Sequence, residues 1–268
     1  MNRTPLLQGK HAVVFGAGGS FGSVVAREFA AEGAEVFLSG RSKPGLEAVA
    51  QQITADGGVA HVALIDAEDP VAVDAYLDGI KGEAGSIDVV FNLVGPRLSE
   101  YGGGKLATML SVEEFMAPLA RLVKSQFITA RAAARHMVEQ RSGVIIFVTG
   151  SPASPHTSGA TAIGAAFGAI ENLTRNLAQD VSPSGVRVVC VRTAATPETR
   201  TIQELRATMT AAMNIPDEQV TRTLSDITLL KVSPTMADLA RAAAFVASDH
   251  ARMMTGTVLN ASAGAAQD

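Results

Sequence analysis

Short apolar runs alternate with longer segments of helical periodicity along most of this chain. Such runs are typical of strands buried on both faces of a sheet, whereas apolar residues recurring every three or four positions indicate amphipathic helices. Strands that alternate with helices at this spacing indicate right-handed βαβ units. The sequence therefore predicts an α/β fold with a doubly wound, Rossmann-like parallel sheet of about seven strands flanked by helices. The predicted strands lie at residues 12–15, 34–39, 59–66, 87–95, 143–151, 186–193 and 256–262.

The predicted helices include a long one from about Val112 to Glu139 and a last one from about Pro234 to Ser248. Residues 96–110 contain three consecutive glycines and are expected to form an irregular, flexible loop above the strand ends. Residues 196–230 are polar, are interrupted by Pro216 and lack strand signals, which predicts helical segments that form a mobile lid. No linker-like stretch or repeat divides the sequence, so residues 1–268 are expected to form a single domain.

The segment VVFGAGGSFG, from Val13 to Gly22, joins the first predicted strand to the first predicted helix. The first backbone N–H groups of a helix lack partners within it, and glycines allow a pyrophosphate to approach them closely. A strand before the glycines and a helix after them is the context that dinucleotide binding requires. The segment therefore predicts a dinucleotide site, and the alternative is a purely structural strand–helix turn.

The second predicted strand ends without an acidic residue, and Gly40, Arg41, Ser42 and Lys43 follow its tip. In a dinucleotide fold, an acidic residue here binds the ribose 2′-hydroxyl of NAD, whereas an arginine accommodates the 2′-phosphate of NADP. A guanidinium binds a phosphate through two hydrogen bonds. This pattern favours NADP(H) over NAD(H), with a solvated loop arginine as the alternative.

Composition and charge exclude several other classes of protein. The 268 residues are 47% hydrophobic and 4% aromatic, contain no tryptophan, and carry a net charge of −4 without a basic cluster, which argues against nucleic-acid binding. No run reaches membrane-spanning length, and no signal peptide is evident, so a cytoplasmic location is expected. The one cysteine, Cys190, lies in an apolar run and is interpreted as a buried core thiol. The five histidines lack metal-ligand spacing, so no metal is expected.

Taken in order, the motifs of the chain resemble those of the short-chain dehydrogenase/reductase family over essentially its whole length. GAGGSFG stands for the family's TGxxxGxG, FNLVG for NNAG, and VTGS for the strand that carries the active-site serine. ENLTRNLAQDVSPSGVRVVCV is similar to the family's helix–loop–strand segment, and MTGTVLNASAGA to its ITGxxLxVDGG ending. The middle glycine of the family's loop falls on Ser20, although Gly16, Gly19 and Gly22 satisfy the variant spacing TGxxGxxG.

The resemblance and the residue patterns together imply a set of cofactor-binding residues at the ends of the predicted strands. They are Gly16, Gly18, Gly19, Ser20, Phe21, Gly22, Gly40, Arg41, Ser42, Asp66, Ala67, Asn92, Leu93, Val94, Gly95, Thr149, Thr193 and Ala194. Asp66 stands where the resemblance puts the edge of the adenine.

The chain departs from the family at the catalytic residues. Family members use a tyrosine as general acid/base and a lysine four residues later that lowers its pKa, and these positions fall on Ile163 and Phe167. Both tyrosines of the chain precede Ser151, and the only lysine after it is Lys231. Of the family's catalytic set Ser151 alone is retained. The other departures are at the helix asparagine and the Pro-Gly pair, which fall on Leu122 and Thr193-Ala194.

Four side chains are candidates for a substitute acid. His156 follows Ser151 and titrates near neutral pH if its pKa is ordinary, but it is equally a surface loop residue. Tyr101 lies on a loop able to close over the site. Lys124 and Arg131 are on the long helix, where a subunit interface or a solvated face is the alternative.

Three functions remain open on the sequence. The first is a divergent NADP(H)-dependent oxidoreductase that reduces the imine, iminium or enone group of a small, apolar substrate. The second is a catalytically inactive subunit or an NADP(H)-binding regulatory or scaffold protein, which pairs with an active member of the family in a hetero-oligomer. The third is a non-redox isomerase or cyclase. The resemblance implies a homotetramer or homodimer that assembles through the two long helices.

Overall fold

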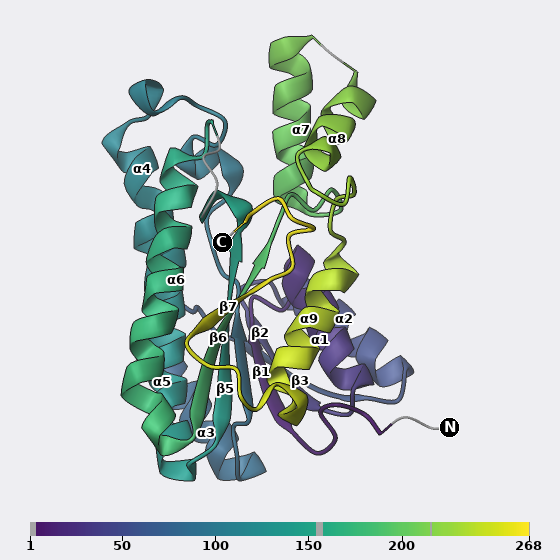
Figure 1. Cartoon of the computed structure of the whole chain (residues 1–268). Helices are drawn as coiled ribbons and strands as arrows, with labels where there is room; N and C mark the ends of the chain where they lie inside the picture. The colour runs from purple at the N-terminus through teal and green to yellow at the C-terminus, as the bar shows by residue number, and fades with distance from the viewer. Residues whose placement is uncertain (1–3, 154–157, 215, 268) are drawn as a thin grey trace.

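The computed structural model describes residues 4–153, 158–214 and 216–267. Its centre is a parallel sheet of seven strands in the order β3-β2-β1-β4-β5-β6-β7 (Figure 1). The strand order reverses beside β1, where β2 lies on one side and β4 on the other, and this topology confirms the predicted doubly wound sheet. The strands are β1 (His11–Phe15), β2 (Glu35–Gly40), β3 (Val59–Leu64), β4 (Val89–Asn92), β5 (Gly143–Gly150), β6 (Val186–Thr193) and β7 (Thr257–Asn260).

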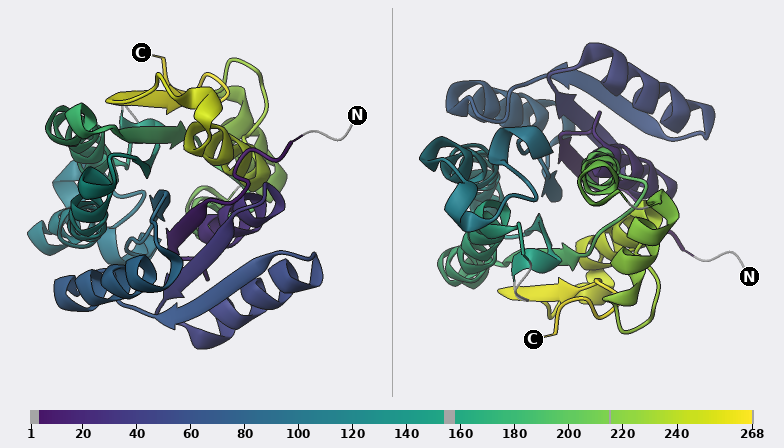
Figure 2. Two further views of the ribbon diagram at one scale, coloured as in Figure 1. Left: turned by 90° about the horizontal axis from the view of Figure 1, so that it is seen from below. Right: turned by 90° about the horizontal axis from the view of Figure 1, so that it is seen from above.

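Helices cover both faces of the sheet (Figures 1 and 2). One face is covered by α1 (Ser20–Ala31), α2 (Lys43–Ala55) and α9 (Met236–Ala247). The other is covered by α3 (Pro70–Ala84), α5 (Lys124–Gln140) and α6 (Thr161–Val181). The remaining helices are α4 (Val112–Pro118), α7 (Arg200–Met213) and α8 (Asp217–Asp226). No helix among the described residues is long and apolar enough to cross a membrane.

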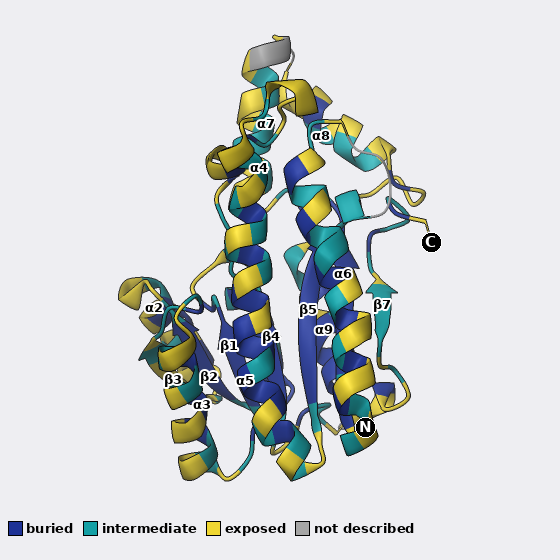
Figure 3. Ribbon diagram, turned by 90° about the vertical axis from the view of Figure 1, so that its left-hand side faces the viewer, coloured by how far each residue is buried: buried dark blue, intermediate teal, exposed yellow. Residues whose placement is uncertain are grey.

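Each central strand contributes side chains to two separate cores, one on each face of the sheet. In β1, Ala12 and Val14 belong to the core under α1, α2 and α9, whereas Val13 and Phe15 belong to the core under α3, α5 and α6. The central strands β1, β2, β4 and β5 are therefore mostly dark blue in Figure 3, while the outer faces of the helices are exposed. Burial on both faces explains why these strands are continuous apolar runs in the sequence.

The edge strand β3 differs from the central strands. Val59, Val62 and Leu64 are 51%, 39% and 57% exposed, because β3 pairs only with β2 and lies at one end of the sheet. The strand also ends at Leu64, before the predicted limit at residue 66.

The long helix predicted from Val112 to Glu139 is interrupted. Its first part, α4, ends at Pro118, and a π-helical turn, η3 (Leu119–Val123), joins it to α5. Proline has no N–H to donate, so the regular ladder of hydrogen bonds is already weakened at this point. The π turn includes Leu122 and packs against α6, so it sets where Leu122 stands.

Two segments above the strand ends differ in how well the sequence anticipates them. Residues 200–213 and 217–226 form α7 and α8, which extend away from the sheet at its carboxyl edge and are joined by an Arg206–Asp217 ion pair (Figure 1). Residues 96–110 are more ordered than the expected irregular loop, because they hold two 3₁₀ turns, η1 (Leu98–Tyr101) and η2 (Ala107–Met109). Leu98 and Tyr101 are buried there and anchor the segment.

Replacing Gln126 with methionine is expected to stabilise the protein. Gln126 of α5 is completely buried, and neither its amide nitrogen nor its amide oxygen has a hydrogen-bond partner among the described residues. Because a buried polar group without a partner costs about 1–3 kcal/mol, an apolar side chain of similar shape should raise the free energy of unfolding by about 1 kcal/mol or more. Urea denaturation measures this change.

The matched control is Gln140→Met. The amide of Gln140 accepts from the backbone N–H of Ile87 and donates to the carbonyl oxygens of Ile87 and Ser142, so its loss should destabilise. A loss of stability in Gln126→Met as large as that in the control would contradict the prediction.

Candidate functional site

The carboxyl ends of the parallel strands meet at one edge of the sheet, below α7 and the 96–110 segment (Figure 1). Ligands of open α/β sheets bind at this edge, outside the point where the strand order reverses. The structure brings the predicted cofactor-binding residues together here. They follow or end the strands β1, β2, β3, β4, β5 and β6.

The glycine loop between β1 and α1 has no room for a side chain at Gly16 or Gly22. Gly16 has a φ of +76° and its N–H donates to the carbonyl oxygen of Ser39. A Cβ atom on Gly22 would stand 2.2 Å from the carbonyl oxygen of Gly16, so the first turn of α1 packs directly on the loop. Gly18 and Gly19 are exposed at the mouth of the loop.

Helix α1 begins at Ser20 with no side-chain cap and no acidic residue in its first turn. Its first backbone N–H groups are therefore available, and they carry the positive end of the helix dipole. The hydroxyl of Ser20 lies beside them and accepts a hydrogen bond of 3.3 Å from the backbone N–H of Arg200, the first residue of α7. Ser20 thus joins the glycine loop to the start of α7.

The end of β2 presents a positive and polar surface beside this loop. Arg41 and Ser42 are exposed, and Arg41 makes no ion pair with any of the described residues. Gly45 lies against the backbone of Gly18, which brings the β2–α2 connection next to the glycine loop. Following β3, the Asp66 carboxylate accepts a hydrogen bond from the N–H of Glu68.

The side chain of Asn92, at the end of β4, is used within the protein. It donates to the carbonyl oxygen of Ser125 and, at 2.7 Å, to the hydroxyl of Thr129, and it accepts from the N–H of Val94. These bonds fix the turn of residues 92–95 against α5. Gly95 lies close to Leu122, where a Cβ atom would be 3.3 Å from that side chain.

A buried polar network lies beneath the ends of β5 and β6. Arg192 of β6 donates to both carboxylate oxygens of Glu171 of α6, at 2.7 and 2.8 Å, and both side chains are almost fully buried. The hydroxyl of Thr149 donates to the same carboxylate and is 3.4 Å from the sulfur of Cys190. Burial raises the pKa of the Cys190 thiol to about 12, so this thiol is inert in the folded protein.

Ser151, Ile163 and Phe167 stand together at the top of β5 and α6. Ser151 is buried at the start of η4 (Ser151–Ala153), directly after β5. The ring of Phe167 packs so closely on Gly150 that a Cβ atom there would be 2.9 Å from it. Ile163 and Phe167 are partly buried and pack against the core, so this wall of the site is apolar.

The remaining candidates for a substitute acid are dispersed. Lys124 is exposed, Arg131 forms an ion pair with Asp74, and His156 lies outside the described residues. Tyr101 packs near Ile163 in a small apolar cluster. No group of three or more histidine, cysteine, aspartate or glutamate side chains that could hold a metal occurs in the part of the chain that the structure describes.

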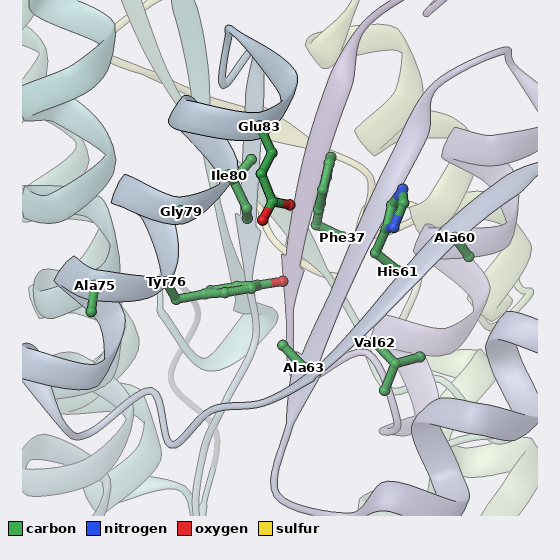
Figure 4. Close-up of a pocket in the computed structure, with 10 residues that line it drawn as sticks. All are labelled: Phe37, Ala60, His61, Val62, Ala63, Ala75, Tyr76, Gly79, Ile80 and Glu83. Carbon is green, nitrogen blue, oxygen red and sulfur yellow. The ribbon is translucent and has the colours of Figure 1, made fainter.

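Tyr76 lines a side hollow of about 600 Å³ between β3 and α3, and its ring packs edge-on against Phe15 of β1, with centroids 6.1 Å apart. Figure 4 shows Tyr76 extending from α3 towards the strands, opposite Phe37 and His61, whose rings stack with centroids 4.7 Å apart. Its hydroxyl is buried without a partner among the described residues, and burial raises its pKa above the ordinary value. None of the predicted site residues lines this hollow.

The residues at the sheet edge fit a dinucleotide. The glycines of the loop, with Gly18 and Gly19 exposed at its mouth, leave room for a diphosphate at the uncapped N–H groups of α1. The hydroxyl of Thr193, at the end of β6, is buried and has no partner among the described residues, so it is available to a bound ligand.

Two features of the site escape sequence analysis. The Glu171–Arg192 pair is separated by 21 residues and forms only when α6 packs on β5 and β6. The contact between Ser20 and Arg200 spans 180 residues. The one available signal is the presence of two arginines, Arg187 and Arg192, in the largely apolar strand β6.

Comparisons with known proteins agree with this geometry. Residues 10–210 match the family model for short chain dehydrogenases. The chain is 31% identical over 260 residues to the uncharacterised oxidoreductase YxbG of Bacillus subtilis, covering 96% of this chain and 91% of that protein.

Solved structures show the same fold. A 7α-hydroxysteroid dehydrogenase in complex with NADH and 7-oxo glycochenodeoxycholic acid superposes with a TM-score of 0.86 at 25% identity, and the alignment covers 100% of this chain and 99% of that one. An actinorhodin polyketide ketoreductase with NADPH has a TM-score of 0.88 at 19% identity, with 97% and 98% covered. The chain therefore belongs to the short-chain dehydrogenase/reductase family and is an oxidoreductase of that family's type, with the nicotinamide dinucleotide cofactor that is typical of it.

Proposed function

We propose that this protein is an NADP(H)-dependent reductase whose substrate needs little general-acid help, such as an imine, an iminium or a conjugated enone. The observation that carries the proposal is the pairing of a close-packed glycine loop and an uncapped α1 N-terminus with an apolar wall at Ile163 and Phe167. The glycine loop and α1 predict that hydride transfer is retained. The apolar wall predicts that proton transfer differs from that of the family. An apolar wall also favours an apolar substrate.

The proposed preference for NADP(H) rests on the end of β2. Arg41 is exposed and makes no ion pair with a described residue, Ser42 lies beside it, and Gly40 stands where an acidic residue would bind a ribose 2′-hydroxyl. The cofactor, when bound, supplies the hydride. In the proposed mode the N–H groups of α1 hold its diphosphate and Arg41 its 2′-phosphate.

We assign to Ser151 a hydrogen bond with the carbonyl or imine group of the substrate. A serine hydroxyl donates a hydrogen bond to such a group but is a poor proton source. A positioned general acid contributes roughly 10²–10⁴-fold, or about 3–5 kcal/mol of barrier. Substitution of the family's tyrosine and lysine by Ile163 and Phe167 therefore disfavours ordinary carbonyl reduction by the family mechanism.

The Arg41→Ala variant tests the cofactor preference. Because a charge-assisted hydrogen bond contributes about 1.5–3 kcal/mol, the variant should bind NADPH about 10- to 100-fold more weakly while its affinity for NADH is unchanged. Calorimetric titration of wild type and variant with each nucleotide measures both constants. The control Arg252→Ala removes an exposed arginine that follows η6 (Asp249–Ala251), and it should change neither affinity.

Equal affinities of the wild type for NADPH and NADH would contradict the preference. Absence of binding by either nucleotide would contradict the oxidoreductase proposal altogether and favour a scaffold or non-redox role.

The apolar wall also supports a second candidate, an inactive subunit or an NADP(H)-responsive binding protein. In that case Ile163 and Phe167 fill a site without chemistry, and the chain pairs with an active family member. Co-purification of a related chain that retains the family's tyrosine and lysine would favour this function. A homo-oligomer with turnover of its own would exclude it.

We further propose that residues 1–268 form a single domain, in which α7 and α8 form a lid over the substrate. We also propose that the protein is a cytoplasmic homodimer or homotetramer, in keeping with its one buried thiol and the assembly implied by the family.

A further inference from the structure

Helix α7 begins beside the first turn of α1, although the two starting points are 180 residues apart in the sequence (Figure 1). The backbone N–H of Arg200, the first residue of α7, donates to the hydroxyl of Ser20 at 3.3 Å. Ser20 is the first residue of α1 and directly follows Gly19, which is exposed at the mouth of the glycine loop. Arg200 therefore stands at the rim of the place where the N–H groups of α1 face a diphosphate.

The backbone at the start of α7 is held in place. The hydroxyl of Thr199, the residue before the helix, donates to the carbonyl oxygen of Thr196 at 2.8 Å. The Glu198 carboxylate accepts from the backbone N–H of Met236, the first residue of α9, at 2.6 Å. Since α9 packs along α1, these bonds fix the position of Arg200 relative to the glycine loop.

The side chain of Arg200, in contrast, is free to change partner. It is 67% exposed, and its Nε donates to the carboxylate of Glu204, one turn further along α7, at 2.9 Å. An exposed pair on a helix is weak, and it is weaker still with the cation on the N-terminal side. The side chain starts beside Ser20 and is long and flexible. Rotation about its bonds therefore carries the guanidinium from Glu204 to the mouth of the glycine loop.

The charge of Arg200 is poorly placed for the stability of α7 alone. A cation at the start of a helix faces the positive end of the helix dipole, and the first turn of α7 contains no acidic residue. The first turn of α1 contains none either. On the other side of the loop, Gly45 packs on Gly18, which brings the connection that carries Arg41 next to the same place. An anion at the mouth of the loop is therefore stabilised by charges from three segments.

We propose that Arg200 binds the diphosphate of the cofactor and exchanges its ion pair with Glu204 for phosphate oxygens. The inference rests on the proposed function and deepens it, since it names a further ligand of the same cofactor. A guanidinium binds phosphate oxygens through two charge-assisted hydrogen bonds, which are stronger than the exposed pair that they replace.

This role differs from the one proposed for Arg41. The 2′-phosphate assigned to Arg41 is present only in NADP(H), whereas the diphosphate is common to NADP(H) and NAD(H). Arg200 therefore contributes to the affinity for both cofactors and leaves the preference between them unchanged. Because Arg200 is the first residue of α7, the bound cofactor also holds the start of the proposed lid.

The test is a calorimetric titration of the wild type and of Arg200→Ala with NADPH, with NADH and with ADP-ribose. The last probe carries the diphosphate without the nicotinamide and without a 2′-phosphate. Because a charge-assisted hydrogen bond is lost, Arg200→Ala should bind all three ligands about 10-fold more weakly. The ratio of its affinities for NADPH and NADH should equal that of the wild type. Its thermal unfolding without a ligand should also match the wild type, since the start of α7 loses only an unfavourably placed cation.

Glu204→Gln is the matched control, because it breaks the same ion pair and leaves the guanidinium in place. Without the competing carboxylate, this variant should bind the three ligands about twofold more tightly than the wild type. Equal losses of affinity in Arg200→Ala and Glu204→Gln would overturn the inference, because they would show that the ion pair acts only through the structure of α7.

Two other results would also overturn it. One is a loss of less than about threefold for ADP-ribose in Arg200→Ala, and the other is a loss confined to NADPH, which would place Arg200 at the 2′-phosphate. Failure of the proposed function is distinguishable from these results. A wild type that binds the three ligands but reduces no imine, iminium or enone refutes the reductase function, while the affinities of the two variants still decide the role of Arg200. A wild type that binds none of the three refutes both.

Discussion

Replacing Arg192 with methionine is expected to lower the free energy of unfolding by about 3–5 kcal/mol. The guanidinium of Arg192 supplies two of the hydrogen bonds that the buried carboxylate of Glu171 receives, and Thr149 supplies another. Without the arginine, the carboxylate remains in the interior with its charge uncompensated. Denaturation by guanidinium chloride, followed by circular dichroism, measures the change.

Two further variants identify the origin of that loss. The double variant Arg192→Met with Glu171→Leu should regain most of the stability, because apolar side chains commonly replace a buried ion pair without loss. Arg241→Met breaks the exposed pair with Asp238, at 2.7 Å, and should cost less than about 1 kcal/mol. A single variant Arg192→Met no less stable than Arg241→Met would contradict the prediction.

Replacing Gly22 with alanine is expected to weaken NADPH binding by about 100-fold or more, equivalent to roughly 3 kcal/mol. The added Cβ atom would lie 2.2 Å from the carbonyl oxygen and 2.7 Å from the carbonyl carbon of Gly16. Both are backbone atoms, so the clash is relieved only if α1 and the loop move apart. That movement separates the N–H groups of α1 from the position of the diphosphate. Calorimetric titration with NADPH measures the loss.

Gly82→Ala is the matched control, since a Cβ atom on this α3 glycine meets nothing within 4 Å. It should leave the affinity unchanged and slightly stabilise the helix. An affinity of Gly22→Ala within about threefold of the wild type would show that the glycine loop does not bind the nucleotide.

The fold is largely predictable because its signals are local. Each buried strand is an apolar run between helical patterns, and the glycines of the first loop have the spacing that a close approach of backbone atoms requires. The edge strand β3 is predicted as well, although its exposed valines could not be anticipated, since position within a sheet is a property of the topology.

The site is less predictable because it depends on contacts between distant segments. The 96–110 segment looks flexible from its glycines, yet Glu100–Arg121 and Gly104–Gly159 hold it in place. The π turn at Leu119–Val123 has no sequence signal beyond the preceding Pro118. The assignment of individual cofactor-binding residues and the NADP(H) preference remain predictions for the titrations described above, and the role of Ser151 remains a prediction.

The buried thiol of Cys190 allows local opening of the protein interior to be measured. It is the only sulfhydryl group in the chain and touches the network that joins β5, β6 and α6. A thiol reagent in the surrounding solution reacts with it only during the moments when this part of the molecule opens. The rate of labelling therefore measures how often the region beneath the site opens. Slower labelling in the presence of a nucleotide would show, without any turnover, that the bound ligand stabilises β5, β6 and α6 against local opening.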